Sequence, residues 1–134
     1  MTNARLEREL VINTENRIEL IGEVSRLFYD MGVNILAVNF RVCGDEATLR
    51  LLTNAQTYAR DALRRAGFFV DEREVVVLEL PERVGFLAKV AEALAREGIK
   101  IHDLYATVSA GSRIATVVFT CSHNSKAVLM FQGR

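Results

Sequence analysis

The sequence contains little proline and little cysteine, with one Pro and two Cys among 134 residues. Half of its residues are hydrophobic and a quarter are charged, which is a globular composition and excludes collagen-like or disordered chains. Cys43 and Cys121 match no metal-ligand spacing and are too few for a disulfide framework. We therefore expect a cytoplasmic protein with reduced thiols, and no motif indicates a metal or another cofactor.

The chain has no excess of either charge. Lys and Arg number 17, as do Asp and Glu, so the formal net charge is zero, whereas nucleic-acid-binding domains usually carry a basic face. No apolar run approaches the roughly 18 to 20 residues that span a bilayer. The segment Met1–Arg5 leads into no signal-type apolar stretch. The sequence thus indicates neither a nucleic acid nor a membrane as partner.

Catalytic constellations are also missing. We find no Ser/His/Asp or Cys/His arrangement in a recognisable context and no glycine-rich phosphate loop. His102 and His123 are isolated in sequence, so we expect structural or solvent-exposed roles for both. The protein is not expected to be an enzyme.

What the sequence does contain is an internal repeat. A shift of 66 residues aligns Ile12–Asn54 with Leu78–Thr120 without a gap, and the two segments share one hydrophobic pattern. Five pairs are identical: Arg17/Arg83, Val24/Val90, Gly32/Gly98, Ile35/Ile101 and Val42/Val108. The repeat predicts two copies of one structural unit.

Each copy shows the same succession of local signals. β-branched runs predict strands at 8–13 and 74–80, and apolar residues at helical spacing follow from positions 18 and 84. Gly32 and Gly98 stand where a left-handed residue ends a helix. Just after residues 35 and 101 the apolar alternation changes phase, which predicts a bulge or bend in each strand.

Later segments complete the pattern. Turns at Gly44-Asp45 and Gly111-Ser112 lead to strands near 46–53 and 113–121. A second helix with an apolar face formed by Ala59, Ala62, Leu63 and Ala66 precedes Gly67. The fold class is α+β: two ferredoxin-like βαββαβ units in tandem, at 1–73 and 74–134. The second unit lacks its last strand and ends in a short helix over 126–131.

The missing strand leaves one edge of Val75–Leu80 open in this scheme. Val75–Leu78 carries no charge, and soluble proteins cover, pair or charge such edges. The short helix at 126–131 is also too apolar for a solvated end. Both features predict a homodimer or larger assembly. The continuous stretch Phe68–Leu80 offers an internal alternative, in which unit one's last strand extends into unit two's sheet.

Two short segments resemble the signature of ACT domains, small ligand-binding modules that typically regulate amino-acid metabolism. They are Leu80–Leu87 (LPERVGFL) and Gly98–Ile101 (GIKI). The resemblance implies an ACT-like fold and a small-molecule effector, an amino acid, bound at an interface between units. It also implies a regulated enzyme as a possible partner.

The resemblance implies site residues as well. Effectors in this family lie against the loop after strand one, the start of helix one and the beginning of strand two. In serine-sensing members two asparagines occupy these places, and they match Asn16, followed by Arg17 and Ile18, and Asn34. In the second copy the corresponding loop is Glu82, Arg83, Val84 and Gly85, where Gly85 keeps the family glycine.

Each of these residues also has a structural interpretation. Asn16 with Glu19 forms a capping-box pattern, and Asn34 fits a polar turn after Gly32. Arg17 and Arg83 fit surface salt bridges as well as an effector carboxylate. Gly85 in a first helical turn indicates close approach of a ligand or of the neighbouring unit. The competing functional hypothesis is a ligand-free module that assembles with itself or with a metabolic enzyme.

Overall fold

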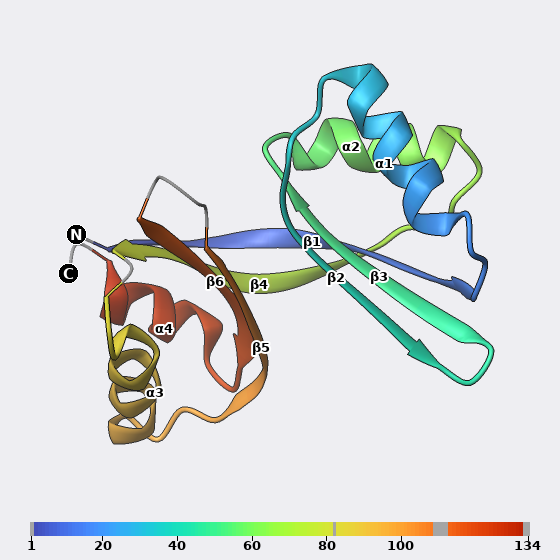
Figure 1. The fold of residues 1–134 in the computed structure, drawn as a ribbon. Coiled ribbons are helices and arrows are strands. Elements are labelled where there is room, and N and C mark those ends of the chain that lie inside the picture. Colours follow the sequence, from blue (N-terminus) through green and yellow to red (C-terminus); the bar gives the residue numbers. More distant parts are fainter. Residues whose placement is uncertain (1, 82, 109–112, 133–134) are drawn as a thin grey trace. The chain divides into compact units, whose positions relative to one another are not determined.

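The computed structural model describes residues 2–81, 83–108 and 113–132, which form an α+β fold (Figure 1). In this part of the chain, one sheet has the strand order β2-β3-β1-β4-β6-β5. The strands are β1 (Asn3–Glu15), β2 (Ile35–Cys43), β3 (Glu46–Thr53), β4 (Asp71–Pro81), β5 (Ile101–Val108) and β6 (Ile114–Cys121). The helices are α1 (Leu20–Met31), α2 (Gln56–Arg65), α3 (Phe86–Arg96) and α4 (Asn124–Phe131). None of these helices has the length and apolarity needed to cross a bilayer.

The chain divides into two compact units. The N-terminal unit is Arg8–Arg73, and the C-terminal unit combines Met1–Glu7 with Glu74–Arg134. The sequence pattern assigns residues 1–7 to the first repeat, whereas the structure groups them with the second. The two long strands β1 and β4 each contribute residues to both units.

In the N-terminal unit, α1 and α2 cover one face of the strands β1, β2 and β3 (Figure 1). Leu20, Val24 and Phe28 of α1 pack with Ala59 and Leu63 of α2 because they recur at helical spacing. On the sheet, alternate residues complete this core: Leu10, Ile12, Ala47, Leu49 and Leu51.

The opposite face of this sheet buries a carboxylate. Glu9 is completely buried and lies 3.1 Å from Nε of Arg50 and 3.0 Å from Nη2 of Arg73. A buried charge is tolerated only when it is paired, so this triad depends on all three side chains. The sequence patterns did not single it out.

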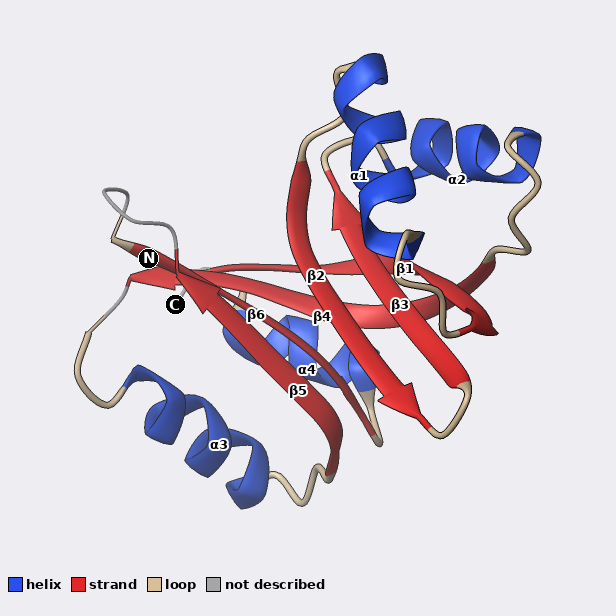
Figure 2. Ribbon diagram, turned by 45° about the vertical axis from the view of Figure 1, so that its right-hand side comes forward, coloured by secondary structure: helices blue, strands red, loops and turns tan. Residues whose placement is uncertain are grey.

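In the C-terminal unit, α3 and α4 cover the strands β4, β5 and β6 (Figure 2). Val90 and Leu94 of α3 and Ala127 and Phe131 of α4 face the sheet core. The sheet contributes alternate residues, namely Val76, Leu78, Leu80, Ala115, Val117 and Phe119.

The edge of β4 that the sequence analysis expects to be open is covered. In the strand order β1 is the neighbour of β4, and Asn3–Glu7 belongs to the same unit as Glu74–Pro81. Ala4 packs in the core of that unit, and Nη1 of Arg5 donates to Oε1 of Glu79 at 3.0 Å. Val75–Leu78 is therefore fully buried, and the expectation of an exposed apolar edge here is wrong.

The structure agrees with the bulges, the helix end and the turn that the sequence predicts. The register of β2 against β3 shifts between Ile35 and Ala37, and that of β5 against β6 shifts between Ile101 and Asp103. The predicted bulges are thus confirmed at equivalent positions. Gly32 ends α1 with φ of 72°, and Gly44 forms the β2–β3 turn with φ of 60°. The predicted turn at Gly111-Ser112 lies outside the described residues.

Candidate functional site

The loop before α1 holds three of the candidate residues: Asn16, Arg17 and Ile18. The N–H of Asn16 donates to the carbonyl of Asp45 at 2.8 Å, and the N–H of Leu20 donates to the carbonyl of Arg17 at 3.2 Å. The N-cap of α1 is Glu19, and no side chain caps this helix. The capping box of Asn16 with Glu19 is therefore wrong, because the backbone makes a turn at 17–20 before the helix begins.

Arg17 is held by carboxylates of its own unit. Its guanidinium donates to both carboxylate oxygens of Glu23, at 3.1 and 3.0 Å, and lies 3.9 Å from Glu19. These hydrogen bonds keep the pKa of Glu23 below its usual range and raise the pKa of Arg17. The surface salt bridge, one of the two interpretations of Arg17, is present.

Asn34 follows α1 in the chain and immediately precedes β2. Its N–H donates to Oδ1 of Asn54 at 3.0 Å, and its carbonyl accepts from the N–H of Asn54 at 3.1 Å. Lys100 makes the equivalent pair of contacts with Ser122, at 3.0 and 2.9 Å. Asn16 and Asn34 thus have different backbone partners, and sequence reasoning missed both Asn54 and Ser122.

A small cavity of about 350 Å³ lies beside Arg17 in the N-terminal unit. Its lining is partly polar: Ile12, Asn13, Thr14, Arg17, Glu23, Ala66, Gly67, Phe68 and Phe69. Oδ1 of Asn13 accepts from the hydroxyl of Thr48 at 2.7 Å, and Glu23 is engaged by Arg17. The polar groups of this cavity are largely satisfied within the unit.

The loop before α3 is the equivalent segment of the C-terminal unit. Glu82 lies outside the described residues; Arg83 and Val84 are exposed, and Gly85 is the N-cap with φ of 86°. A Cβ added to Gly85 would meet no atom within 4 Å. The left-handed backbone by itself accounts for the glycine, and the close approach of a ligand stays a prediction.

Both loops present an aliphatic side chain to solvent. Ile18 is 97% exposed and Val84 is 106% exposed, although the apolar spacing places them on the buried faces of helices. The expectation fails because α1 and α3 begin only at Leu20 and Phe86. Neither helix has a side-chain cap, and each loop carries an arginine before its aliphatic residue.

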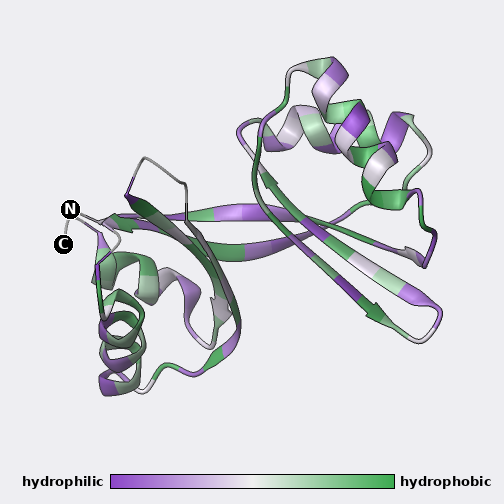
Figure 3. Ribbon diagram, in the orientation of Figure 1, coloured by the Kyte–Doolittle hydropathy of each residue, from purple (hydrophilic) through white to green (hydrophobic). Residues whose placement is uncertain are grey.

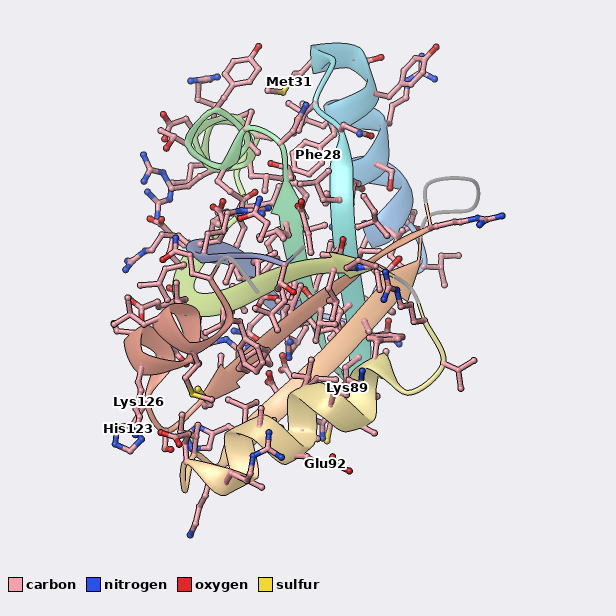
Figure 4. The ribbon with its side chains drawn as sticks, turned by 90° about the vertical axis from the view of Figure 1, so that its left-hand side faces the viewer. Phe28, Met31, Lys89, Glu92, His123 and Lys126 are labelled. Atoms are coloured by element: carbon pink, nitrogen blue, oxygen red, sulfur yellow. The ribbon has the colours of Figure 1, made fainter. Side chains whose placement is uncertain are left out.

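A larger groove of about 590 Å³ runs from this loop along α3. Its lining is Thr2, Leu80, Pro81, Arg83, Val84, Phe86, Lys89, Val90, Glu92, Ala93, Arg96 and Phe131. The apolar members Leu80, Val90, Ala93 and Phe131 are almost fully buried and form the floor. Hydrophobic and hydrophilic segments alternate along α3 (Figure 3), and Lys89 and Glu92 project from it (Figure 4).

The histidines and cysteines are the remaining residues that the sequence analysis considered. Within residues 2–81, 83–108 and 113–132, no group of three His, Cys, Asp or Glu side chains could hold a metal ion. Nδ1 of His123 lies 2.9 Å from the hydroxyl of Ser122. Cys121 is buried, and burial raises the pKa of its thiol. Cys43, at the end of β2, is exposed.

No protein-family model and no curated protein matches this sequence. Solved structures do match. Protein BT0572 from Bacteroides thetaiotaomicron has 28% identity and a TM-score of 0.83, over 95% of this chain and 87% of that one. The regulatory subunit of aspartate kinase from Thermus thermophilus has 15% identity and a TM-score of 0.59, over 94% and 92%.

The corresponding regulatory subunit from Thermus flavus has 14% identity and a TM-score of 0.57, over 96% of this chain and 92% of that one. At such identities the likeness concerns the fold. It extends over nearly the whole of each chain, so it supports the ACT-like fold that the sequence motifs imply.

Proposed function

We propose that this chain is a non-catalytic regulatory protein that binds a small effector, an amino acid, and transmits its presence to a partner enzyme. One observation carries the proposal. Both helix entrances combine an arginine, a fully exposed aliphatic residue and a first helical turn without a side-chain cap. The arrangement recurs at positions 17–20 and 83–86, which are equivalent in the repeat.

The chemistry of a free amino acid suits such an entrance. The uncapped first turn offers N–H groups and the positive end of the helix dipole to a carboxylate. The arginine adds a charge-assisted donor, and the exposed Ile18 or Val84 offers apolar surface to the side chain. Asn16 and Asn34 are the proposed polar contacts in the N-terminal unit, and Glu82 is the proposed one in the C-terminal unit.

The fold likeness to regulatory subunits supports a regulatory rather than a catalytic role. These neighbours are named as parts of aspartate kinase, an enzyme of amino-acid metabolism. We therefore propose that the partner of this chain is also a metabolic enzyme.

A thermal-shift screen of the twenty amino acids tests the proposal. An effector at 100 times its Kd adds about 2.7 kcal/mol, which raises the melting temperature of a domain of this size by several degrees. We expect one amino acid, or a few related ones, to produce such a shift. If none of the twenty moves the midpoint, the effector hypothesis fails.

A specific surface favours the second candidate, a ligand-free interaction module. Val38, Phe40 and Val42 lie along one face of β2 and are 50%, 37% and 44% exposed. β2 is the last strand of the sheet order, so its outer edge has no neighbour among the described strands. In this alternative the exposed strip binds a second copy or a metabolic enzyme directly, and no amino acid is needed.

A further inference from the structure

The charged residues of α3 beside the groove have the opposite sign to the residues at the equivalent positions of α1. Positions 23, 26 and 30 of α1 correspond to positions 89, 92 and 96 of α3, and every one of them changes sign: Glu23 to Lys89, Arg26 to Glu92, Asp30 to Arg96. Arg17 and Arg83, in contrast, are identical. The repeat therefore provides a comparison of one framework with two charge patterns.

In the N-terminal unit these charges neutralise one another. Arg17 pairs with Glu23 at 3.0 Å, and Nε of Arg26 pairs with Asp30 at 3.2 Å. In the C-terminal unit Lys89 stands where Glu23 would be, so the position that pairs with Arg17 offers Arg83 no carboxylate. Among the described residues no ion pair engages Arg83, Lys89 or Arg96, and the described lining of the groove holds these three cations and one carboxylate, Glu92.

The two units also differ in the size and polarity of side chains at equivalent positions. Leu27 of α1 packs against the core of its unit, and the equivalent residue of α3 is Ala93. Thr14 and Glu15 are likewise replaced by the apolar Leu80 and Pro81. The smaller Ala93 helps to open the groove, and the replacements at 80 and 81 make part of its lining apolar.

We propose that the α3 groove binds a small organic carboxylate that carries an apolar chain. The carboxylate lies near Arg83 and Lys89, where the uncapped start of α3 adds the positive end of the helix dipole. The chain lies over Leu80, Val90, Ala93 and Phe131. From Phe86 to Arg96 the helix extends about 15 Å at about 1.5 Å per residue, which accommodates an elongated ligand.

This inference goes beyond the amino-acid hypothesis. The three cations of the described lining favour a ligand with a net negative charge over one that also carries an ammonium group in the groove. The groove shares Arg83 and Val84 with the proposed effector loop, and its other lining residues lie outside that loop.

Calorimetric titration of the full chain with decanoate, and with decylamine as the same chain bearing a cation, tests the site. We expect saturable binding of one decanoate, and binding of decylamine that is at least tenfold weaker.

Two variants test the lining of the groove. Lys89→Glu places a carboxylate where it can pair with Arg83, as Glu23 pairs with Arg17, and Ala93→Leu introduces the larger side chain that α1 has at the equivalent position. Each should weaken decanoate binding about tenfold or more. Lys100→Glu changes the charge of the same unit outside the groove and should leave decanoate affinity unaltered.

Circular dichroism and melting curves verify that each variant folds; because Lys89 is exposed, Lys89→Glu remains informative even if Ala93→Leu does not fold. The proposal is overturned if decanoate shows no saturable binding or if decylamine binds equally well. It is also overturned if Lys89→Glu and Lys100→Glu reduce affinity alike. An amino acid that raises the melting temperature while decanoate does not bind leaves the effector hypothesis standing and removes this one.

Discussion

At the residue scale, a substitution of Asn16 should affect ligand affinity without the loss of stability that its capping-box pattern predicts. Its side chain caps no helix, because α1 begins four residues later with Glu19 as N-cap. Its backbone N–H is bonded to Asp45, and this contact does not depend on the side chain. A substitution of Asn16 should therefore report on ligand contact alone.

We expect Asn16→Ala to change the free energy of unfolding by less than about 0.5 kcal/mol. If Asn16 contacts the effector as proposed, its affinity should fall by about 1 to 3 kcal/mol, because a hydrogen-bond partner is lost. Asn16→Asp removes the amide donors and adds a charge, so it should also weaken binding. Melting curves and calorimetric titration with the effector measure both quantities. Unaltered affinity in both variants would remove Asn16 from the site.

The ion pair between Arg17 and Glu23 makes a prediction about pH. A carboxyl whose pKa is lowered in the folded state stabilises that state above its unfolded pKa, and the contribution is lost as pH falls through the folded pKa. Arg17→Gln should return the pKa of Glu23 toward its ordinary range, because the main cause of the shift is the hydrogen bond from Arg17.

Carbon-detected NMR titration of the Glu23 carboxyl measures this shift. Arg26→Gln, which removes the neighbouring pair with Asp30, serves as the control and should leave the pKa of Glu23 unchanged. Equal pKa values of Glu23 in the unaltered protein and in Arg17→Gln would contradict the contact.

At the scale of the element, the N-cap residues of α1 and α3 have different backbone conformations. Glu19 caps α1 with a right-handed φ of −86°, whereas Gly85 caps α3 with a left-handed φ of 86°. The glycine is needed for its conformation, since the space around it is open. The two helices also differ inside, because α1 contains Gly22 where α3 has Ala88.

These two glycines should respond in opposite directions to alanine. Gly85→Ala should destabilise the protein by about 1 kcal/mol or slightly more, because an L-residue is strained at this φ. Gly22→Ala lies within α1, where no atom within 4 Å opposes a Cβ, and should stabilise by up to about 1 kcal/mol. Chemical denaturation of both variants measures the difference. Destabilisation of equal size in both would indicate that helix packing, rather than φ, controls the response.

At the scale of the whole molecule, residues 1–7 belong to the same compact unit as the residues from Glu74 onward. Ala4 lies in the core formed by Val76, Leu78 and Phe119, and Arg5 pairs with Glu79. The N-terminal unit has its own core, formed by residues such as Leu49 and Leu51.

Deletion of residues 2–7 should consequently destabilise the C-terminal unit selectively. Removing this strand segment exposes the edge of Val75–Leu80 and takes Ala4 out of the core. In amide hydrogen exchange we expect Val76, Leu78 and Phe119 to lose protection while Leu49 and Leu51 keep theirs. Equal loss in the two cores, or no loss in either, would argue against this division of the chain.

Self-association is the second prediction at this scale. Because β4 is covered, the apolar strip of Val38, Phe40 and Val42 on the edge strand β2 replaces it as the proposed dimer contact. Light scattering at tens of micromolar should give about twice the 15.0 kDa of one chain, and Phe40→Glu should return the mass to one chain. A mass near one chain for the unaltered, folded protein would exclude this dimer.

Local features of this protein were determined by its sequence. The helix stop at Gly32, the turn at Gly44 and the bulges after Ile35 and Ile101 each follow from a few adjacent residues. Backbone conformation and hydrophobic alternation act over such short distances, so they are readable without a structure. The internal repeat was also found without a structure, because aligning the sequence with itself compares only residue types.

Tertiary structure alone decided which distant residues meet. The pairing of Arg5 with Glu79 spans 74 positions, and strand pairing leaves no local mark that would assign residues 1–7 to the later unit. Side-chain positions likewise decided that Arg17 pairs with Glu23, whereas Arg83, its identical counterpart, makes no ion pair with any residue that the structure describes and lines a groove with an apolar floor. Ion pairs and cavities depend on positions within a few ångströms, and only the folded chain brings these groups together.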